Sequence, residues 1–97
     1  MAELNETIHQ PVRLRIMTAL VTLKANEEVD FSYLRDLLEV TDGNLGAHLR
    51  KLEDAGYITV SKVFVERKPR TYVFVTVEGR KVFQEHVAAL EAILKSK

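Results

Sequence analysis

Between residues 41 and 54, polar and very small side chains recur at the spacing of one face of a helix. Leu45, Leu49 and Leu52 lie at i, i+4 and i+7, which predicts a narrow buried stripe. At about 100° per residue, four residues then point away from this stripe: Gly43, Ala47, Arg50 and Asp54. Three more lie along one flank: Asn44, His48 and Lys51. The chemistry that this face offers is hydrogen bonding by amide, imidazole and cationic groups.

The same face has the profile of a helix that enters the major groove of DNA, which is about 12 Å wide. Gly46 and Ala47 permit a close approach, and Ala47 could touch a thymine methyl group. Asn44 could pair with adenine, and Arg50 could reach guanine or a phosphate. Thr41 and the helix N-terminus offer N–H donors to a phosphate. The alternative is a solvated helix face on which Asn44 only supports the cap.

A second set of basic residues lies in Glu66-Arg67-Lys68-Pro69-Arg70. The flanking stretches Tyr57–Val65 and Thr71–Val77 are rich in Val, Thr, Tyr and Phe, so we expect a β-hairpin with a polar turn over residues 66–70. Its basic tip, with Lys62 nearby, could lie along phosphates or place an arginine in the minor groove. The alternatives are ordinary solvation of a turn and protection of the hairpin edge.

The charge of the chain is polarised although it sums to zero. There are 14 basic and 14 acidic residues. Residues 57–81 contain six basic and two acidic residues, whereas residues 1–40 contain four basic and seven acidic ones. The isoelectric point of about 6.8 lies below that of many nucleic-acid binders. We therefore expect affinity for DNA to come from the local basic patch and from having two copies of it.

Catalytic and metal chemistry have little support. His9, His48 and His86 are scattered, and there is no cysteine, His-x-x-x-His or Gly-x-Ser-x-Gly pattern. The adjacent carboxylates of Glu27-Glu28 and Glu53-Asp54 give no sign of an acid/base pair. The sequence has no glycine-rich phosphate loop, and His86 with a neighbouring glutamate is too little for a metal site. We expect no enzyme activity, no cofactor and no metal.

Length and composition fit a soluble globular protein. The chain has 97 residues, of which 46% are hydrophobic and 29% charged, and we expect residues 1–97 to form one domain. No apolar run approaches the roughly 20 residues of a membrane span, and residues 1–6 do not resemble a signal peptide. These features favour a cytoplasmic protein without membrane contact.

Four helices are expected around the hairpin. The first covers about His9–Leu23, with Pro11 in its first turn and Asn26 as a stop. The second follows a cap at Asp30 and an isolated strand residue at Val29. Its apolar stripe comprises Phe31, Leu34, Leu37 and Leu38.

The third helix is expected between an N-cap at Thr41 and a C-terminal glycine at Gly56. The tight connection between the second and third helices indicates a helix-turn-helix. The last helix is expected at Val77–Lys95, capped by Thr76. The fold class is thus α+β: three helices, a hairpin and a long C-terminal helix.

The last helix has a wide apolar face. One stripe comprises Phe83, Val87, Leu90 and Leu94, and a second comprises Val82, Ala89 and Ile93. A small domain needs only one of them, so the other favours a homodimer interface, unless both serve the core of their own chain. The residues expected at this interface are Leu4, Ile8, Val12, Val82, Val87, Leu90, Ile93 and Leu94. A two-fold dimer would place two recognition helices in successive major grooves.

The order of elements resembles a winged helix-turn-helix domain, similar to small stand-alone regulators of the MarR-like and ArsR-like families. The resemblance is carried by residues 9–17, 41–58 and 67–80, and it implies a dimer that regulates transcription. The family usually has Ser or Thr where this sequence has Gly46.

We therefore expect a homodimer that binds double-stranded DNA and represses by covering a promoter. The residues expected to contact DNA are Thr41, Asn44, Gly46, Ala47, His48, Arg50, Lys51, Lys62, Arg67, Lys68 and Arg70, with Arg80 and Lys81 as further phosphate contacts. An unidentified small-molecule effector in the dimer crevice is compatible with this prediction. The alternative is a winged-helix module that binds a protein.

Overall fold

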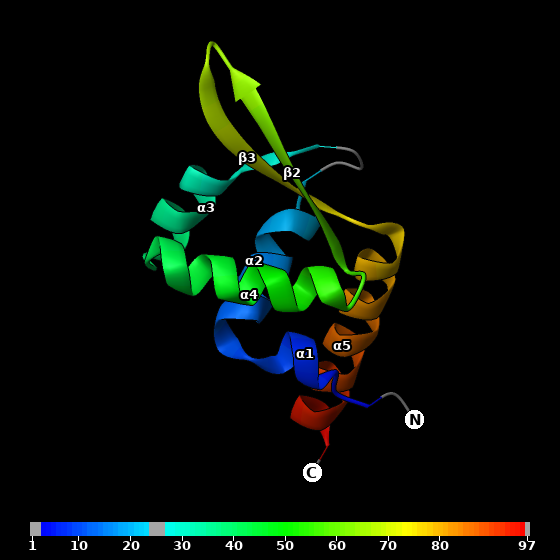
Figure 1. Cartoon of the computed structure of the whole chain (residues 1–97). Helices are drawn as coiled ribbons and strands as arrows, with labels where there is room; N and C mark the ends of the chain where they lie inside the picture. Colours follow the sequence, from blue (N-terminus) through cyan, green and yellow to red (C-terminus); the bar gives the residue numbers. More distant parts are fainter. Residues whose placement is uncertain (1–2, 24–26, 97) are drawn as a thin grey trace.

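The computed structural model describes residues 3–23 and 27–96, which form an α+β fold. Its elements in chain order are α1 (Glu6–His9), α2 (Pro11–Val21), β1 (Val29–Asp30), α3 (Phe31–Leu38), α4 (Asp42–Asp54), β2 (Ile58–Val65), β3 (Lys68–Val75) and α5 (Val77–Lys95). The expected fold class and the order of the helix-turn-helix, hairpin and last helix are confirmed (Figure 1).

The first predicted helix, expected at about His9–Leu23, corresponds to α2 and is shorter at both ends. Gln10 is extended between α1 and α2, because a residue before proline is disfavoured in the helical region, and its side chain caps α2 by accepting from Arg13 N–H. Pro11 occupies the first turn as expected. The short helix α1, capped by Asn5, was not predicted, and α2 ends at Val21. The expected stop at Asn26 lies outside the described residues.

The helix-turn-helix has the predicted caps. Asp30 accepts hydrogen bonds from the first turn of α3, and Thr41 does the same for α4. Gly56 follows α4 with a φ of 83°, the left-handed conformation that glycine adopts without strain. Of the apolar stripe predicted for α3, Leu34 and Leu38 are buried, but Leu37 is 50% exposed, so its assignment to the core was wrong.

The hairpin turn is shorter than predicted. Only Glu66 and Arg67 form it, both at positive φ, and Lys68, Pro69 and Arg70 belong to β3. A two-residue turn with two positive φ angles matches the twist of antiparallel strands. The sheet order is β1-β3-β2, and β1 pairs with β3 at Tyr72 and Val73, several residues from the turn. Pro69 therefore lies where its missing N–H disturbs no pairing with β1.

The core lies where α2, α3 and α4 pack against the base of the sheet. Ile8, Ile16, Met17, Leu20, Val29, Leu34, Leu38, Leu45, Leu49, Leu52, Ile58 and Val73 are its buried residues. The stripe predicted for α4 is thus confirmed. Helix α5 begins after its predicted cap, Thr76, whose hydroxyl also donates to the Gly56 carbonyl at 2.7 Å. This bond ties the start of α5 to the end of α4.

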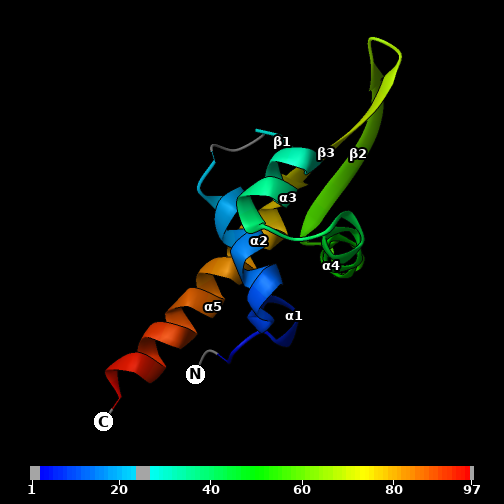
Figure 2. The ribbon, with the colours of Figure 1, turned by 90° about the vertical axis from the view of Figure 1, so that its left-hand side faces the viewer.

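The molecule is elongated, with extents of 56 × 25 × 21 Å. Figure 2 shows the hairpin, hereafter the wing (residues 58–75), and the C-terminal end of α5 projecting in opposite directions. Helix α4 lies on the same side as the wing. Within the described residues, none of the helices combines the length and the apolar character that a membrane span requires.

Candidate nucleic-acid interface

The start of α4 is fixed by two neighbouring groups. Thr41 Oγ1 accepts from Asn44 N–H at 3.0 Å. Arg35 of α3 donates to Asp42 at 2.9 Å and to Asp36 at 3.0 Å. A helix of 13 residues is thereby held at a fixed orientation to α3, and the N–H groups of its first turn remain at the surface.

Most of the predicted contact face of α4 is exposed. The exposed residues are Thr41, Asn44, Ala47, Arg50 and Lys51, whereas Gly46 and His48 are half-buried. A Cβ atom added at Gly46 would meet nothing within 4 Å. The absence of a side chain at residue 46 therefore leaves open space beside the helix, as a close approach by a large ligand requires.

His48 contributes to packing between helices. Arg13 of α2 donates from Nη1 to His48 Nδ1 at 3.3 Å, and its Nε donates to the Thr7 carbonyl. Burial and the Arg13 guanidinium lower the pKa of His48 below its ordinary value. The imidazole is therefore neutral near pH 7, so its interaction with a phosphate would be that of a hydrogen-bonding group without charge.

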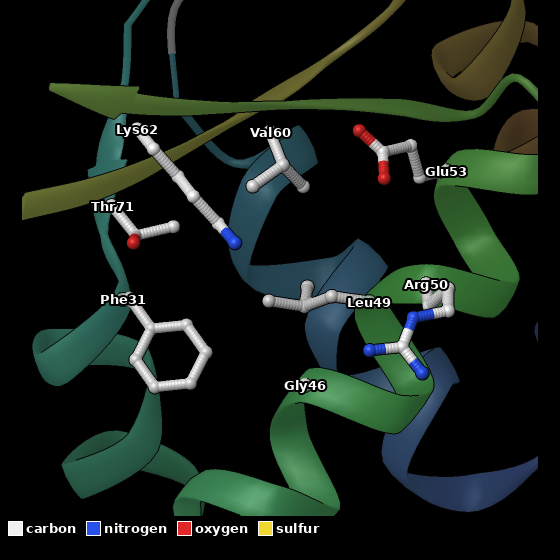
Figure 3. Close-up of a pocket in the computed structure, with 8 residues that line it drawn as sticks. All are labelled: Phe31, Gly46, Leu49, Arg50, Glu53, Val60, Lys62 and Thr71. Atoms are coloured by element: carbon white, nitrogen blue, oxygen red, sulfur yellow. The ribbon is translucent and has the colours of Figure 1, made fainter.

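Helix α4 and the wing face each other across a cleft of about 300 Å³. Its lining residues are Phe31, Gly46, Leu49, Arg50, Glu53, Val60, Lys62 and Thr71. Figure 3 shows the guanidinium of Arg50 and the ammonium of Lys62 entering this cleft from α4 and from β2. Two cations that the sequence separates by twelve positions thus share one concave surface.

The three basic residues of the predicted tip differ in their surroundings. Arg67 and Lys68 are exposed at the end of the wing. Arg70 pairs with Asp30 at 3.2 Å. Burial raises the pKa of Asp30, but bonds from the Tyr33 and Ser32 N–H groups and from Arg70 outweigh it, and the pKa lies below its ordinary value. Arg70 therefore ties the wing to the start of α3, and a phosphate contact by Arg70 would compete with this pair.

The structure contradicts the suggested role of Arg80. Its guanidinium donates to the carbonyl of Val21 at 3.1 Å and to that of Leu23 at 2.8 Å. These carbonyls at the end of α2 would otherwise lack a helical partner. Arg80 thus caps α2 from α5, whereas Lys81 is exposed.

The predicted interface residues divide into three groups. Ile8 is fully buried in the core of its own chain, so it is not available to a partner. Leu4, Val12, Val82, Val87 and Leu90 are half-buried. Ile93 and Leu94 are 54% and 81% exposed. The exposed apolar surface is therefore concentrated at the C-terminal end of α5.

Two features were not singled out from the sequence. Phe64, at the end of the wing, is 78% exposed. The alternation of Val60, Lys62 and Phe64 along the predicted strand could have indicated that Phe64 shares a face with Lys62. The other feature is His86, which is fully buried and lies beside His9. The separation of these two histidines in the sequence follows no motif that would predict their contact. Within the described ranges, no group of three His, Asp or Glu residues is arranged to hold a metal ion.

Comparison with known proteins gives consistent results. The sequence model of a family described as winged helix DNA-binding domain matches residues 12–94. An uncharacterized protein of Methanocaldococcus jannaschii is 33% identical over 85 residues, which cover 88% of this chain and 89% of that one.

Two solved structures extend the comparison. A transcriptional regulator homologue from Pyrococcus horikoshii is 33% identical, with a TM-score of 0.83 over 93% of this chain and 86% of that one. A transcriptional regulator of the MarR family from Enterococcus faecalis is 25% identical, with a TM-score of 0.69 over 91% and 73%.

Proposed function

Because this chain belongs to the family of winged helix DNA-binding domains, we propose that it acts as a homodimeric, sequence-specific repressor of transcription. DNA-binding regulation is the function of the family, which consists of regulators rather than enzymes. We further propose which residues contact DNA, that two copies assemble into a dimer, and that this dimer represses by covering a promoter. We also propose that residues 1–97 form one domain.

The observation that carries the proposal is the cleft between α4 and the wing. The polar face of α4 and strand β2, which carries Lys62, lie on one side of the molecule (Figure 2). We propose that α4 enters the major groove, where Asn44, Ala47 and Arg50 contact bases. Lys62 and Lys51 then contact phosphates on either side of the groove, with Thr41 at the helix start.

The wing supplies the second set of contacts. Arg67 and Lys68 are placed to interact with phosphates or with the minor groove beyond the cleft. Arg70 supports this surface mainly by holding the wing to Asp30. His48 contacts the phosphate backbone as a neutral hydrogen-bonding group.

The absence of net charge on a single chain favours binding by two copies. We propose that the exposed apolar end of α5 pairs with its equivalent in a second copy, together with Leu4 and Val12. The dimer would then cover two half-sites and exclude RNA polymerase from a promoter. A small-molecule effector would act by binding in the crevice of this dimer.

The test is a fluorescence-anisotropy titration with fragmented genomic duplex DNA across a salt series, followed by sequencing of the bound fraction. We expect enrichment of a two-fold symmetric sequence. Binding should weaken as salt rises, by about 0.9 logarithmic units per decade of salt for each phosphate contacted. Arg50→Ala should weaken binding to the enriched sequence, and Arg67→Ala should reduce the salt slope.

Arg15→Ala is the matched control, since Arg15 is exposed on α2, a helix outside the proposed contact surface. If Arg50→Ala and Arg67→Ala bind like the Arg15→Ala control, the assigned contact surface is wrong. If the protein binds no DNA at low salt, the proposed function fails and a protein-binding module becomes the better explanation. Binding without enrichment contradicts sequence specificity.

A further inference from the structure

The end of the wing carries a large apolar side chain that nothing covers within the described part of the chain. Phe64 is 78% exposed and pairs across the hairpin with Pro69. Exposing an aromatic ring to water is unfavourable, and the wing end lies away from the core that would bury it (Figure 1). A solvent-facing position at the tip of a hairpin would ordinarily be polar.

The register of the hairpin shows which face Phe64 is on. Residues two apart in a strand share a face, and residues paired across two strands share it too. Phe64 and Pro69 therefore continue the face of Lys62 and Thr71, which line the cleft opposite α4. Val63, Val65, Lys68 and Arg70 are on the opposite face. The aromatic ring thus extends the surface assigned to DNA.

The charges around Phe64 indicate what could cover it. Lys62 lies on the same face as Phe64, Arg67 is in the exposed turn beside the acidic Glu66, and Lys68 follows the turn on the opposite face. An apolar side chain bordered by cations suits a ligand with stacked apolar surfaces between two rows of phosphates, which is the minor groove of DNA. It suits less well an apolar protein surface, which would leave the three cations without partners.

We propose that Phe64, supported by Pro69, is a wedge that enters the minor groove next to the half-site read by α4 and partly separates two stacked base pairs. Side chains such as phenylalanine and proline insert in this way in other proteins and kink the duplex by about 20–90°. The two stacked base pairs that separate at the lowest energetic cost are those of a pyrimidine–purine step, such as TA or CA. The inference rests on the proposed function, and it adds bending and a preference for such a step under the wing.

The experiment uses the full chain and a duplex of about 40 base pairs that carries the enriched sequence, short against the persistence length of about 150 base pairs. End labels report bending by resonance energy transfer, and a 2-aminopurine placed at the step under the wing reports unstacking. We expect both signals to rise when the parent protein binds and neither to rise with Phe64→Ala. The dissociation constant should change less than about tenfold, since burying the ring and unstacking the bases oppose each other.

Two variants separate the wedge from a structural role in the hairpin. Phe64→Leu keeps an apolar wedge and should retain most of the bend. Val63→Ala shortens an apolar residue on the opposite face of the same strand and should retain all of it. Circular dichroism and thermal unfolding establish that each variant is folded.

Three results would contradict the proposed wedge. The parent protein could bind DNA without bending it, or the complex with Phe64→Ala could be as bent as that with the parent. The third is a Val63→Ala variant that loses the bend to the same extent as Phe64→Ala. Absence of any DNA binding by the parent would instead be the failure of the proposed function. The anisotropy titration with the parent protein identifies that case before any variant is made.

Discussion

At the scale of single residues, the buried His86, with the exposed His9 beside it, links the N-terminal segment to α5. Asn5 N–H donates to His86 Nδ1 at 2.9 Å, so Nδ1 is the acceptor and the proton of the neutral ring is on Nε2. His86 Nε2 lies 3.4 Å from His9 Nδ1. The Asn5 side chain also donates to the Tyr57 hydroxyl at 2.9 Å. A proton added at His86 Nδ1 would break the bond to Asn5 and put a charge in the core.

The burial of His86 predicts how stability depends on pH. Burial and the neighbouring His9 lower the pKa of His86 below its ordinary value of 6.5. The unfolded chain then binds the proton more readily than the folded one. The stabilisation that the folded chain gains from a neutral His86 is complete above pH 6.5. It is lost as the pH falls from 6.5 through the pKa of His86 in the folded chain. We expect the free energy of unfolding, measured in urea, to fall over this range by at most about 1.4 kcal/mol per pH unit for each such histidine.

His86→Gln should reduce this slope, because glutamine keeps an acceptor for Asn5 and does not titrate. His48, whose pKa is also lowered, makes a second contribution, so the slope should be smallest in the variant with both histidines replaced. Asp30 titrates below its ordinary value of 3.8 and does not affect this range. An unchanged slope in His86→Gln would mean that His86 does not contribute to the dependence of stability on pH.

At the scale of elements, the local patterns predict what the chain can form by itself. The caps Asp30, Thr41 and Thr76 act through bonds to N–H groups two or three positions away, so the starts of α3, α4 and α5 followed from sequence. The turn Glu66-Arg67 lacks the glycine or asparagine that signals a two-residue hairpin, and it was predicted too long. Helix α1 has only four residues, too few for a periodic pattern.

The candidate site was predictable in part for the same reason. The exposed face of α4 follows from three leucines on one helix, whereas the roles of Arg70 and Arg80 depend on partners 40 and at least 57 positions away. Such long-range contacts leave no periodic trace in the sequence. Leu37 satisfies the helical period of α3 but is half exposed, because the period identifies an apolar face without showing how far the neighbouring elements cover it.

Two glycines in helices should respond in opposite ways to the same substitution. Gly46→Ala in α4 places a Cβ in open space and should stabilise the chain by about 0.5–1 kcal/mol, because alanine has the higher helix propensity. Gly79→Ala in α5 places a Cβ in steric conflict with the Tyr57 carbonyl oxygen, which also accepts from Thr76 N–H at 3.0 Å. We expect a loss of about 1–3 kcal/mol from this overpacking.

Urea unfolding of both variants beside the parent is the measurement, and each glycine serves as the control for the other. Equal losses would mean that α4 does not have open space at residue 46. The DNA affinity of Gly46→Ala gives a separate result, since a methyl group there would enter the cleft that α4 shares with the wing.

At the scale of the whole molecule, the proposed DNA contacts and the proposed dimer contacts occupy opposite ends. The wing and α4 lie on one side, and the apolar end of α5 projects from the other (Figure 2). A change at Leu94 is therefore expected to act on assembly without touching the DNA surface or the core. Leu94 is 81% exposed in the single chain, so a charge there costs the fold itself little.

Leu94→Asp should convert the proposed dimer into monomers of 11.1 kDa, which sedimentation velocity resolves. The charge would be buried against its symmetric copy, where two like carboxylates repel. Affinity for a duplex with two half-sites should fall by about 10²–10⁴, because the second contact loses its high effective concentration. Affinity for a single half-site should stay unchanged. Ala92→Asp adds the same charge at an exposed position about 200° around the helix, and it should remain dimeric. If Leu94→Asp sediments like Ala92→Asp, as a dimer, the interface lies elsewhere on the molecule.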